Sequence, residues 1–264
     1  MKKILIFTIT LLSLASCKKS DDTGGGINLF SIEDDKQLGA QVAAEIASDP
    51  ATYPILSESQ YPAAYGHIRR ITDNVLNSGK VRYRNDFVWE VKIIRDDNTL
   101  NAFCTPGGYM YVYTGLIKYL ENEAQLAGVM GHEIAHADLR HSTENLTKQY
   151  GLSVLVGVLL GENQGLLTDI AQSLTSLSFS RAAEREADDW SVIYLYETAY
   201  QANGAAGFFE KIEAQGGANP PEFLSTHPNP DNRIENINAK YQELGGKGGE
   251  AFVTRYNDFK ASLP

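Results

Sequence analysis

The chain has 264 residues, of which 43% are hydrophobic and 21% are charged, so it can bury one large core or two small ones. Its formal net charge is −10, and nothing in the sequence resembles a basic stripe that could bind phosphates. Composition and charge therefore predict a globular protein and argue against nucleic acid as its main partner.

The start of the chain has the pattern of an export signal. Lys2 and Lys3 precede the apolar run "ILIFTITLLSLA", which is too short to span a bilayer comfortably. The run leads into "LASC", and small residues directly before a cysteine resemble the bacterial lipobox. We predict that residues 1–16 are a signal peptide and that Cys17 is lipidated; a plain secretory signal with a chance cysteine is the alternative. Lys18, in place of the aspartate that retains lipoproteins in the inner membrane, favours the outer membrane of the cell envelope.

Residues 17–30 are polar and rich in glycine, which is typical of a flexible tether. Such a tether would hold residues 31–264, the predicted folded domain, off the membrane that the N-terminal lipid enters. Lipid on Cys17 would leave Cys104 without a cysteine partner, so we expect no internal disulfide. We predict that Cys104 is a small packed residue.

Helical and strand patterns divide the rest of the chain. Residues 31–48 and 64–78 have helical periodicity, and Ser31 with the acidic residues after it marks the first helix start. Residues 87–97 alternate as strands do, and residues 98–117 indicate two strands around a Pro-Gly-Gly turn. The remainder is mostly helical. The predicted fold class is therefore α+β, mainly α, with a small antiparallel β-sheet.

Residues 144–160 have a helical pattern with an apolar end, which Gly161 interrupts before a membrane span could be complete. We expect this segment to be buried or to form a flap over a cleft. Four more helical patterns follow, over residues 166–180, 181–200, 204–215 and 231–244.

The stretch "VMGHEIAHADLRH" contains the pattern H-E-x-x-H. On a helix, His132 and His136 lie on the same face, so both imidazoles can reach one metal ion at about 2.0–2.1 Å. Glu133 is rotated by about 100° from His132 but stays beside the metal, where it can take a proton from a water molecule. Apolar neighbours indicate that the histidines are buried, and buried polar groups need a partner. We predict one zinc ion (Zn2+) per chain, with Glu133 as the catalytic base.

The residues after this motif argue against a third ligand from the same helix. A metzincin needs glycine at position 139 and histidine at position 142, where this sequence has Leu139 and Ser142. His141 is one place early, about 100° round the helix from the required position. We interpret His141 as a residue at the helix C-terminus, where the helix dipole favours it.

The other known route to a third ligand is a glutamate from a second helix, as in thermolysin. The segment "RAAEREADD" offers Glu184 and Asp188, which share a helical face with Ala187 and Ser191, small residues that would let two helices lie close together. In this interpretation Glu184 binds the metal and Asp188 accepts the second N–H of a ligating histidine. Glu186 with Asp189 is a competing pair, and spacing alone favours Glu184 only modestly.

Three separated segments, "GHEIAHADLRHS", "SRAAEREAD" and "STHPNPDNR", resemble in order the motifs of the M-forty-eight metallopeptidases. These are gluzincins related to the CAAX prenyl endopeptidase and to periplasmic quality-control proteases, some of them lipoproteins of the outer membrane. The resemblance extends over roughly residues 31–245 and includes "NAFCTPGGYMYVYTGLI". It implies a zincin-like fold, with Glu184, the first residue of E-x-x-A-D, as the metal glutamate and Asp188 as the aspartate of the motif.

The same resemblance implies roles for four other residues. His227 in "STHP" can approach the metal as an extra ligand that keeps the enzyme latent, or it can contact the substrate or the developing oxyanion; a turn histidine before proline is the third alternative. Arg233 is expected to fix this loop by pairing with a carboxylate, although a surface arginine also fits. Asn101 and Ala102 are the candidates for the strand edge with which relatives bind an extended peptide.

The sequence thus predicts a zinc-dependent endopeptidase of the bacterial envelope that acts on unfolded or misassembled polypeptide substrates. The alternative is a chaperone or assembly factor for outer-membrane proteins with latent protease activity. A structural zinc site with four protein ligands is a third alternative. The sequence predicts no oligomeric state.

Overall fold

The computed structural model describes residues 30–176, 178–215, 222–228 and 232–264. The predicted signal peptide, the predicted lipidation site Cys17 and nearly all of the predicted tether lie outside the described residues. Those three assignments therefore stay predictions.

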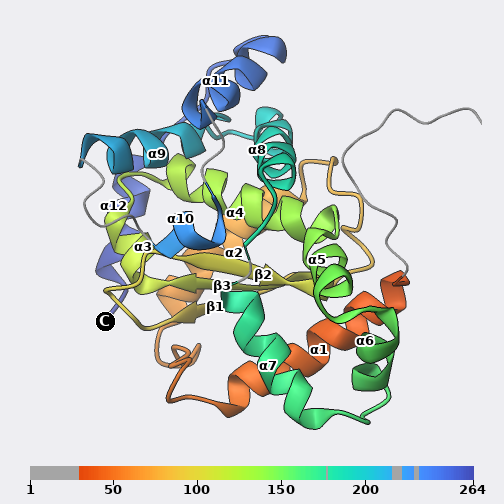
Figure 1. Ribbon diagram of the computed structural model, residues 1–264. Coiled ribbons are helices and arrows are strands. Elements are labelled where there is room, and N and C mark those ends of the chain that lie inside the picture. Colours follow the sequence, from red (N-terminus) through yellow and green to blue (C-terminus); the bar gives the residue numbers. More distant parts are fainter. Residues whose placement is uncertain (1–29, 177, 216–221, 229–231) are drawn as a thin grey trace, which may run out of the picture.

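The described chain has a small sheet with helices on both of its faces (Figure 1). The strands are β1 (Glu90–Ile94), β2 (Ala102–Thr105) and β3 (Tyr109–Tyr113), and a 3-10 turn, η1 (Pro106–Gly108), joins the last two. The helices are α1 (Ile32–Ser48), α2 (Pro62–Leu76), α3 (Thr114–Tyr119), α4 (Glu123–Asp138), α5 (His141–Tyr150), α6 (Leu152–Leu159), α7 (Gln164–Thr175), α8 (Arg181–Tyr196), α9 (Gly204–Ala214), α10 (Glu222–Thr226), α11 (Arg233–Glu243) and α12 (Val253–Ala261).

The sheet has the strand order β1-β3-β2. β2 and β3 form the predicted antiparallel hairpin, in which Gly107 and Gly108 have φ values of 75° and 88° that glycine adopts without strain. β1 pairs with β3 in parallel, so the prediction of an antiparallel sheet is wrong for this pair. The reason is the strand order: the chain crosses from β1 to the far side of β3 before it forms the hairpin. The predicted α+β, mainly α class is confirmed, with a mixed sheet.

Alternation along the strands gives the sheet two buried faces. Cys104, Met110 and Val112 face a core that they share with α2 and α4. Phe103 and Tyr111 face a second core that they share with α1, α6 and α7. Figure 1 shows α4 along one side of the sheet and α1 with α7 along the other. Cys104 is buried and free, in agreement with the predicted packed residue.

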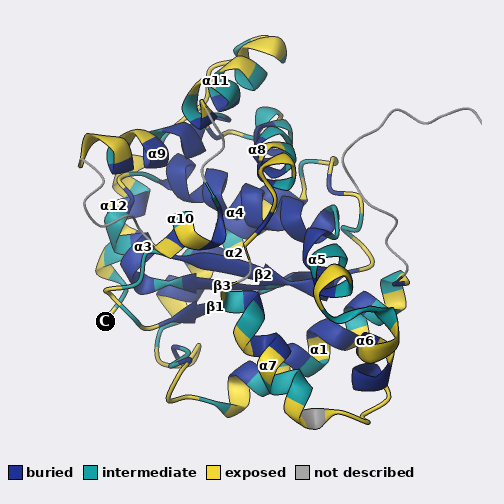
Figure 2. Cartoon of the chain, viewed as in Figure 1, coloured by how far each residue is buried: buried dark blue, intermediate teal, exposed yellow. Residues whose placement is uncertain are grey.

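α4 is the central helix of the molecule, and every residue from Glu123 to Asp138 is buried (Figure 2). α8 packs directly against it. Ser191 Oγ on α8 donates to the carbonyl oxygen of Gly128 at 2.7 Å, and a Cβ at Gly131 would lie only 2.9 Å from that hydroxyl oxygen. Small residues therefore allow the two helices to approach closely, as predicted for the face that carries Ser191.

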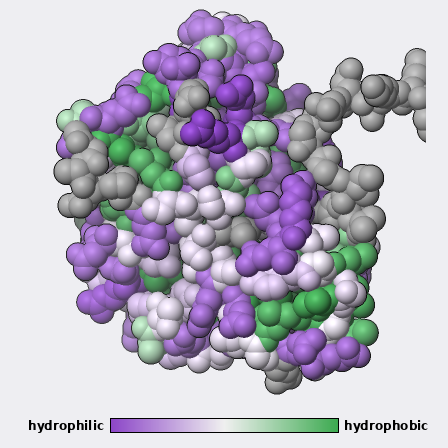
Figure 3. Space-filling model, viewed as in Figure 1, coloured by the Kyte–Doolittle hydropathy of each residue, from purple (hydrophilic) through white to green (hydrophobic). Residues whose placement is uncertain are grey.

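The apolar segment 144–160 forms two helices instead of one, because Gly151, at φ 81°, separates α5 from α6. α6 covers the second core, but its outer side is exposed: Val156 is 40% and Leu160 is 70% exposed. This side lies in the hydrophobic area at the lower right of Figure 3. The segment is thus half-buried. Among the described residues, no helix is both long enough and apolar enough to cross a membrane.

Candidate active site

His132 and His136 project in the same direction from successive turns of α4. They are 2% and 0% exposed, and their Nε2 atoms lie 3.0 Å apart. Two imidazole nitrogens at this distance need a proton or a cation between them, because two lone pairs that face each other would repel. The spacing of H-E-x-x-H therefore produces a converging pair of candidate ligand atoms.

A carboxylate from α8 completes this group. Ser180 caps α8 by accepting a hydrogen bond from the Ala183 N–H at 3.2 Å, and the first turn directs the fully buried Glu184 inward. Glu184 Oε1 lies 3.4 Å from His136 Nε2, and Glu184 Oε2 lies 3.5 Å from His132 Nε2. Both carboxylate oxygens thus face the two imidazoles.

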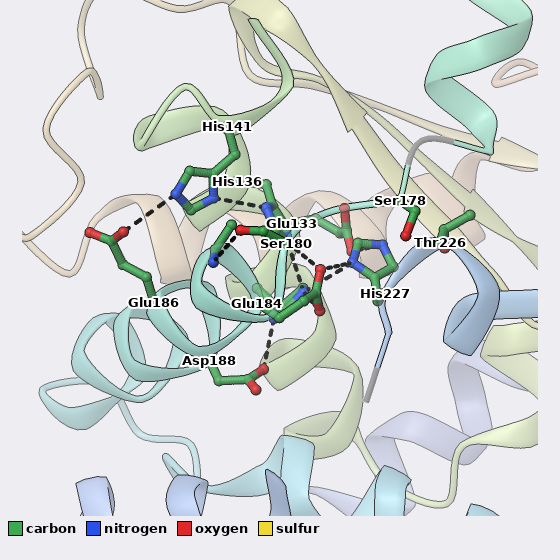
Figure 4. A network of polar contacts seen from close by, with 12 residues as sticks. Glu133, His136, His141, Ser178, Ser180, Glu184, Glu186, Asp188, Thr226 and His227 are labelled. Atoms are coloured by element: carbon green, nitrogen blue, oxygen red, sulfur yellow. Dashed lines mark hydrogen bonds and ion pairs between the residues drawn. The ribbon is translucent and has the colours of Figure 1, made fainter. Parts of the chain in front are cut away.

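Of the two acidic pairs that the sequence left open, only Glu184 and Asp188 reach the two histidines of α4 (Figure 4). Glu186 instead pairs with His141. Asp189 is half-buried and pairs with a lysine of α11. The structure therefore places the first pair, and not the competing pair, at the candidate site.

His227 follows α10 directly and is only 1% exposed, so it is buried in the site and is not a turn histidine on the surface. Its Nδ1 lies 3.2 Å from His132 Nε2 and 3.1 Å from Glu184 Oε1. Its ring stacks on Phe223 with the ring centroids 4.3 Å apart, which fixes its orientation. Candidate ligand atoms of His132, His136, Glu184 and His227 all lie within 4.8 Å of one another.

Asp188 and Arg233 form hydrogen bonds and ion pairs with the candidate ligands His132 and Glu184. Asp188 Oδ1 lies 2.8 Å from His132 Nδ1, and Arg233 Nη2 donates to the same carboxylate oxygen at 2.7 Å. Arg233 is 2% exposed, its guanidinium lies over the ring of Phe209 at 4.1 Å, and its Nη2 is 3.2 Å from Glu184 Oε2. Arg233 is therefore not a surface arginine, and its carboxylate partners are on α8.

Glu133 is buried beside the cluster. Its Oε1 lies 3.3 Å from His227 Nε2 but has no hydrogen-bond partner of good geometry among the described residues. Burial raises the pKa of Glu133, and the nearby His227 and His132 only partly oppose that rise. A buried carboxylate with a raised pKa is suited to accept a proton and to release it again.

The surroundings also set the protonation of the candidate ligands. Burial lowers the pKa of His132, but the hydrogen bonds that its ring donates to Asp188 and Glu184 outweigh burial and raise this pKa to about 9. Burial and the neighbouring His132 lower the pKa of His136 well below its usual value. Burial raises the pKa of Glu184, yet the surrounding histidines, His227 first, outweigh burial and hold this pKa well below its usual value. Glu184 is thus ionised and His136 neutral, which are the forms that bind metals, whereas His132 carries a proton that a metal ion must displace.

A divalent cation fits this group of atoms. Glu184 Oε2 is buried without a hydrogen-bond partner in the described chain, although Arg233 Nη2 is 3.2 Å away. A cation between Glu184, His132 and His136 would give this oxygen a partner and would bind the lone pairs of the two facing nitrogens. Imidazole nitrogens with a carboxylate oxygen form a donor set that suits zinc.

α4 ends at Asp138, so the prediction that His141 lies at a helix C-terminus is wrong. Arg140 has a φ of 64°, in the left-handed region, and this turn lets α5 begin at His141. The turn brings the His141 ring back toward His136, so that their Nδ1 atoms lie 2.9 Å apart. His141 is not among the converging ligand atoms, as the sequence predicted. Its contact with His136, however, could not be predicted from helical spacing.

The predicted substrate-binding residues lie at one edge of the sheet. Among the described strands, β2 has a neighbour on one side only. The Tyr113 N–H donates to the carbonyl of Asn101, so alternation directs the main-chain groups of Ala102 and Cys104 away from β3. The Asn101 side chain accepts a hydrogen bond from the Ala102 N–H at 2.9 Å. Ala102 therefore offers its carbonyl at the edge, because its N–H is already bonded, and Asn101 offers no main-chain group there. Cys104 is an edge residue that the sequence interpretation missed, and its carbonyl accepts a hydrogen bond from Ser142 Oγ at 3.4 Å.

Two buried histidines one turn apart on a helix, facing a glutamate from a second helix, define a metallopeptidase of the gluzincin class. The family assignment agrees with this class. The chain belongs to the family described as Peptidase family M48, because the model of that family matches residues 62–240. The match spans α4, α8 and the residue directly after α10, which together carry the four candidate ligands.

Several known proteins have similar sequences. Mitochondrial metalloendopeptidase OMA1 of Arabidopsis thaliana is 35% identical over 144 residues, which are 53% of this chain and 29% of that protein. Beta-barrel assembly-enhancing protease of Escherichia coli (strain K12) is 28% identical over 174 residues, 56% of this chain and 34% of that protein. Metalloprotease YcaL of the same strain is 26% identical over 254 residues, 89% of this chain and 95% of that protein. The aligned part of this chain thus spans about a third of the first two relatives and nearly all of the third.

Proposed function

We propose that this chain is a zinc-dependent endopeptidase of the bacterial envelope that hydrolyses peptide bonds in unfolded or misassembled envelope proteins. The observation that carries the proposal is the convergence of His132, His136 and Glu184, with the buried Glu133 beside them. Membership of the peptidase family and similarity to proteins named metalloproteases support the reaction type.

His132, His136 and Glu184 are the proposed ligands of one zinc ion. Two imidazole nitrogens and a carboxylate oxygen are the three-ligand set of a catalytic zinc site that keeps one open position. Zinc, when bound, polarises the scissile carbonyl and lowers the pKa of a water molecule to about 7. Asp188 accepts the Nδ1–H of His132, which fixes the tautomer that leaves Nε2 free for the metal. Arg233 in turn holds the Asp188 carboxylate in place.

Glu133 is the proposed proton carrier. It follows His132 directly on α4, and its raised pKa allows it to accept a proton from the attacking water and to donate this proton to the leaving amine. His227 Nε2 lies 3.3 Å from Glu133 Oε1, so His227 can orient this carboxylate when it is not engaged with the metal.

We assign recognition of extended polypeptide to the outer edge of β2. A peptide that paired with the outward Ala102 carbonyl and Cys104 N–H would add a strand to the sheet; the Ala102 N–H and the Cys104 carbonyl are bonded to the Asn101 and Ser142 side chains. Cys104 lies near the proton carrier because α4 packs against β2, and burial first and the charge of Glu133 second raise the pKa of the Cys104 thiol. Recognition through the main chain requires an extended segment, and this requirement favours unfolded substrates.

The proposed location in the cell envelope depends on the N-terminal sequence and on the relatives. Residues 1–16 and Cys17 have the pattern of a signal peptide and a lipidation site, and Lys18 favours the outer membrane. Relatives named beta-barrel assembly-enhancing protease support an envelope protein that acts on other envelope proteins.

Casein digestion by the full-length chain, purified in detergent, tests the proposed reaction. We expect hydrolysis that a zinc chelator abolishes and that added zinc restores. The matched variant Glu133→Gln should bind the same amount of zinc but cut about 10²- to 10⁴-fold more slowly. Equal rates for the two proteins, or hydrolysis that persists without zinc, would exclude the proposed mechanism.

A chaperone or assembly factor for outer-membrane proteins is the second candidate function, because His227 lies among the candidate ligand atoms. A fourth protein ligand would close the position that a catalytic zinc site keeps open. Aggregation of an unfolded β-barrel membrane protein distinguishes this candidate. Equal suppression of this aggregation by wild type and by Glu133→Gln, with no cleavage of the membrane protein even by His227→Ala, would support the chaperone function. Aggregation that wild type does not suppress would exclude it.

A further inference from the structure

His136 makes a second polar contact on the side of its ring that faces away from the candidate ligand atoms (Figure 4). Its Nε2 faces Glu184, whereas its Nδ1 lies 2.9 Å from His141 Nδ1. The other nitrogen of His141, Nε2, lies 3.5 Å from Glu186 Oε2. The three side chains thus form a chain of contacts that begins at a candidate ligand atom and ends at a carboxylate that is 24% exposed.

The direction of these hydrogen bonds follows from the donors available. An ionised Glu186 can only accept, so a neutral His141 donates through Nε2–H and keeps the lone pair on its Nδ1. That lone pair accepts the Nδ1–H of His136. The proton of His136 is therefore held on Nδ1, and the lone pair that remains on its Nε2 points at Glu184 and His132.

The two histidines of α4 are thus supported in different ways. The Nδ1 of His132 contacts the buried carboxylate of Asp188 directly, at 2.8 Å. No carboxylate contacts the Nδ1 of His136 among the described residues; His141 occupies that place and passes the contact on to Glu186. Histidines that bind metals usually need such an acceptor at the second nitrogen, because it fixes both the tautomer and the orientation of the ring.

The backbone holds His141 in this position. The left-handed turn at Arg140 lies directly before α5, which begins at His141. The Arg140 side chain donates to the carbonyl oxygen of Phe30 at 2.6 Å and to the carboxylate of Asp35. Thr143, in the first turn of α5, donates to the same carboxylate at 2.7 Å. Residues of the N-terminal helix region thus fix the position from which His141 reaches His136.

We propose that His141 and Glu186 are positioning residues for the metal ion: together they hold the proton of His136 on Nδ1 and so present its Nε2 to the metal. The inference rests on the proposed function only in requiring a metal at the cluster. It predicts that metal affinity depends on an acceptor at position 141, independently of whether the chain cleaves peptides.

Zinc affinity of the full-length chain, measured by competition with a chromophoric chelator at fixed pH, tests this proposal. His141→Leu removes the acceptor and should weaken zinc binding by about 10- to 100-fold. His141→Asn places an amide oxygen near the position of Nδ1 and should recover most of that loss. Glu186→Gln, at a partly exposed side chain, should cost about tenfold. The matched control is His67→Leu, because His67 is a half-buried histidine that stacks on Phe259. The zinc affinity of this variant should equal that of wild type.

The visible spectrum of the cobalt-substituted proteins gives an independent readout. Reorientation of His136 should change the cobalt bands of His141→Leu but not those of His141→Asn or the control. Wild-type zinc affinity in His141→Leu overturns the proposal, and so does an equal loss in the Leu and Asn variants, because packing alone would then explain it. If His141→Leu does not fold, Glu186→Gln decides: an unchanged affinity overturns the proposal.

The same proteins separate this proposal from the proposed function. Affinities in the expected order, together with equal casein hydrolysis by wild type and Glu133→Gln, would leave the positioning role intact and exclude the endopeptidase mechanism. A wild-type chain that does not bind zinc would overturn both.

Discussion

Two clusters of buried acidic groups lie along α4, and they are satisfied in opposite ways. Glu123, the first residue of the helix, is fully buried and accepts hydrogen bonds from Arg70 Nη2 at 2.9 Å, from Arg255 Nε at 2.8 Å and from the hydroxyl of Tyr200 at 2.6 Å. Toward the other end of the helix, Glu133 Oε1 and Glu184 Oε2 are buried without hydrogen-bond partners among the described residues.

The difference separates a structural cluster from a functional one. Burial raises the pKa of Glu123, but hydrogen bonds from Arg70 and Arg255 outweigh burial and hold this pKa below its usual value. The cluster at Glu123 is therefore complete within the chain. The cluster at Glu133 and Glu184 leaves two buried carboxylate oxygens without partners among the described residues, as expected if the proposed cation and the water that it would activate complete it. Mutations in the cluster at Glu123 should change the stability of the protein. Mutations in the cluster at Glu133 and Glu184 should change metal binding and hydrolysis.

The largest effect is expected for Glu184→Gln. This change keeps the size of the side chain but removes one of three proposed metal ligands. Zinc affinity should fall by more than about 100-fold, beyond the loss typical of residues that only support a ligand. Chelator competition measures the affinity, and urea unfolding in excess chelator measures stability. An affinity within tenfold of wild type would show that Glu184 is not a ligand and would remove the contrast between the two clusters.

Glu123→Gln should destabilise the protein by about 3 kcal/mol, because it leaves two arginines facing an uncharged group. This value is at the low end for a broken buried pair, since the side chains of Arg70 and Arg255 are 31% and 36% exposed. Zinc affinity should not change. Glu121→Gln is the matched control: Glu121 is 60% exposed beside Lys211, and its loss should cost less than about 1 kcal/mol. Equal destabilisation by the two changes would contradict the structural role of Glu123.

His227→Ala should have a smaller effect, and its sign is informative. Because His227 Nδ1 lies 3.1 Å from Glu184 Oε1, the side chain can occupy the fourth position on the metal. Its removal should weaken zinc binding by about tenfold or less and should raise kcat. Steady-state hydrolysis of a quenched peptide separates kcat from KM. A lower kcat/KM at unchanged zinc affinity would assign His227 to the substrate and not to the metal.

The local part of the candidate site could be predicted from the sequence. The helical period alone places His132 and His136 on one face and Glu133 beside them. The choice of Glu184 over Glu186 needed more, because it depends on which face α8 turns toward α4. Small residues such as Ser191 indicated that face, and the structure shows that they allow the close approach of the two helices.

The parts that could not be predicted depend on contacts between distant segments. Strand patterns predicted the hairpin of β2 and β3. The parallel pairing of β1 with β3 depends on the order of the strands in the sheet, which the sequence of a single strand does not indicate. The end of α4 at Asp138 was missed because arginine rarely adopts a left-handed conformation, and Arg140 is held in it by Asp35, which lies 105 residues earlier in the chain. The roles proposed for His141 and Glu186 follow from that turn and were invisible to helical spacing.

The smallest expected effect is a dependence of stability on pH that belongs to the structural cluster alone. The pKa of Glu123 is lowered in the folded chain, so the folded state binds fewer protons there than the unfolded state does. The stability that Glu123 contributes is therefore fully present above its unfolded pKa of about 4.3 and is lost as the pH falls through the folded value.

Urea unfolding of wild type and Glu123→Gln, both in excess chelator, should give curves of unfolding free energy against pH that converge below about pH 4. Subtraction of the two curves cancels the contributions of Glu133 and Glu184, which both proteins share. A difference that stayed constant down to acidic pH would mean that the arginines do not lower the pKa of Glu123, and the distinction between a complete and an incomplete cluster would lose its electrostatic basis.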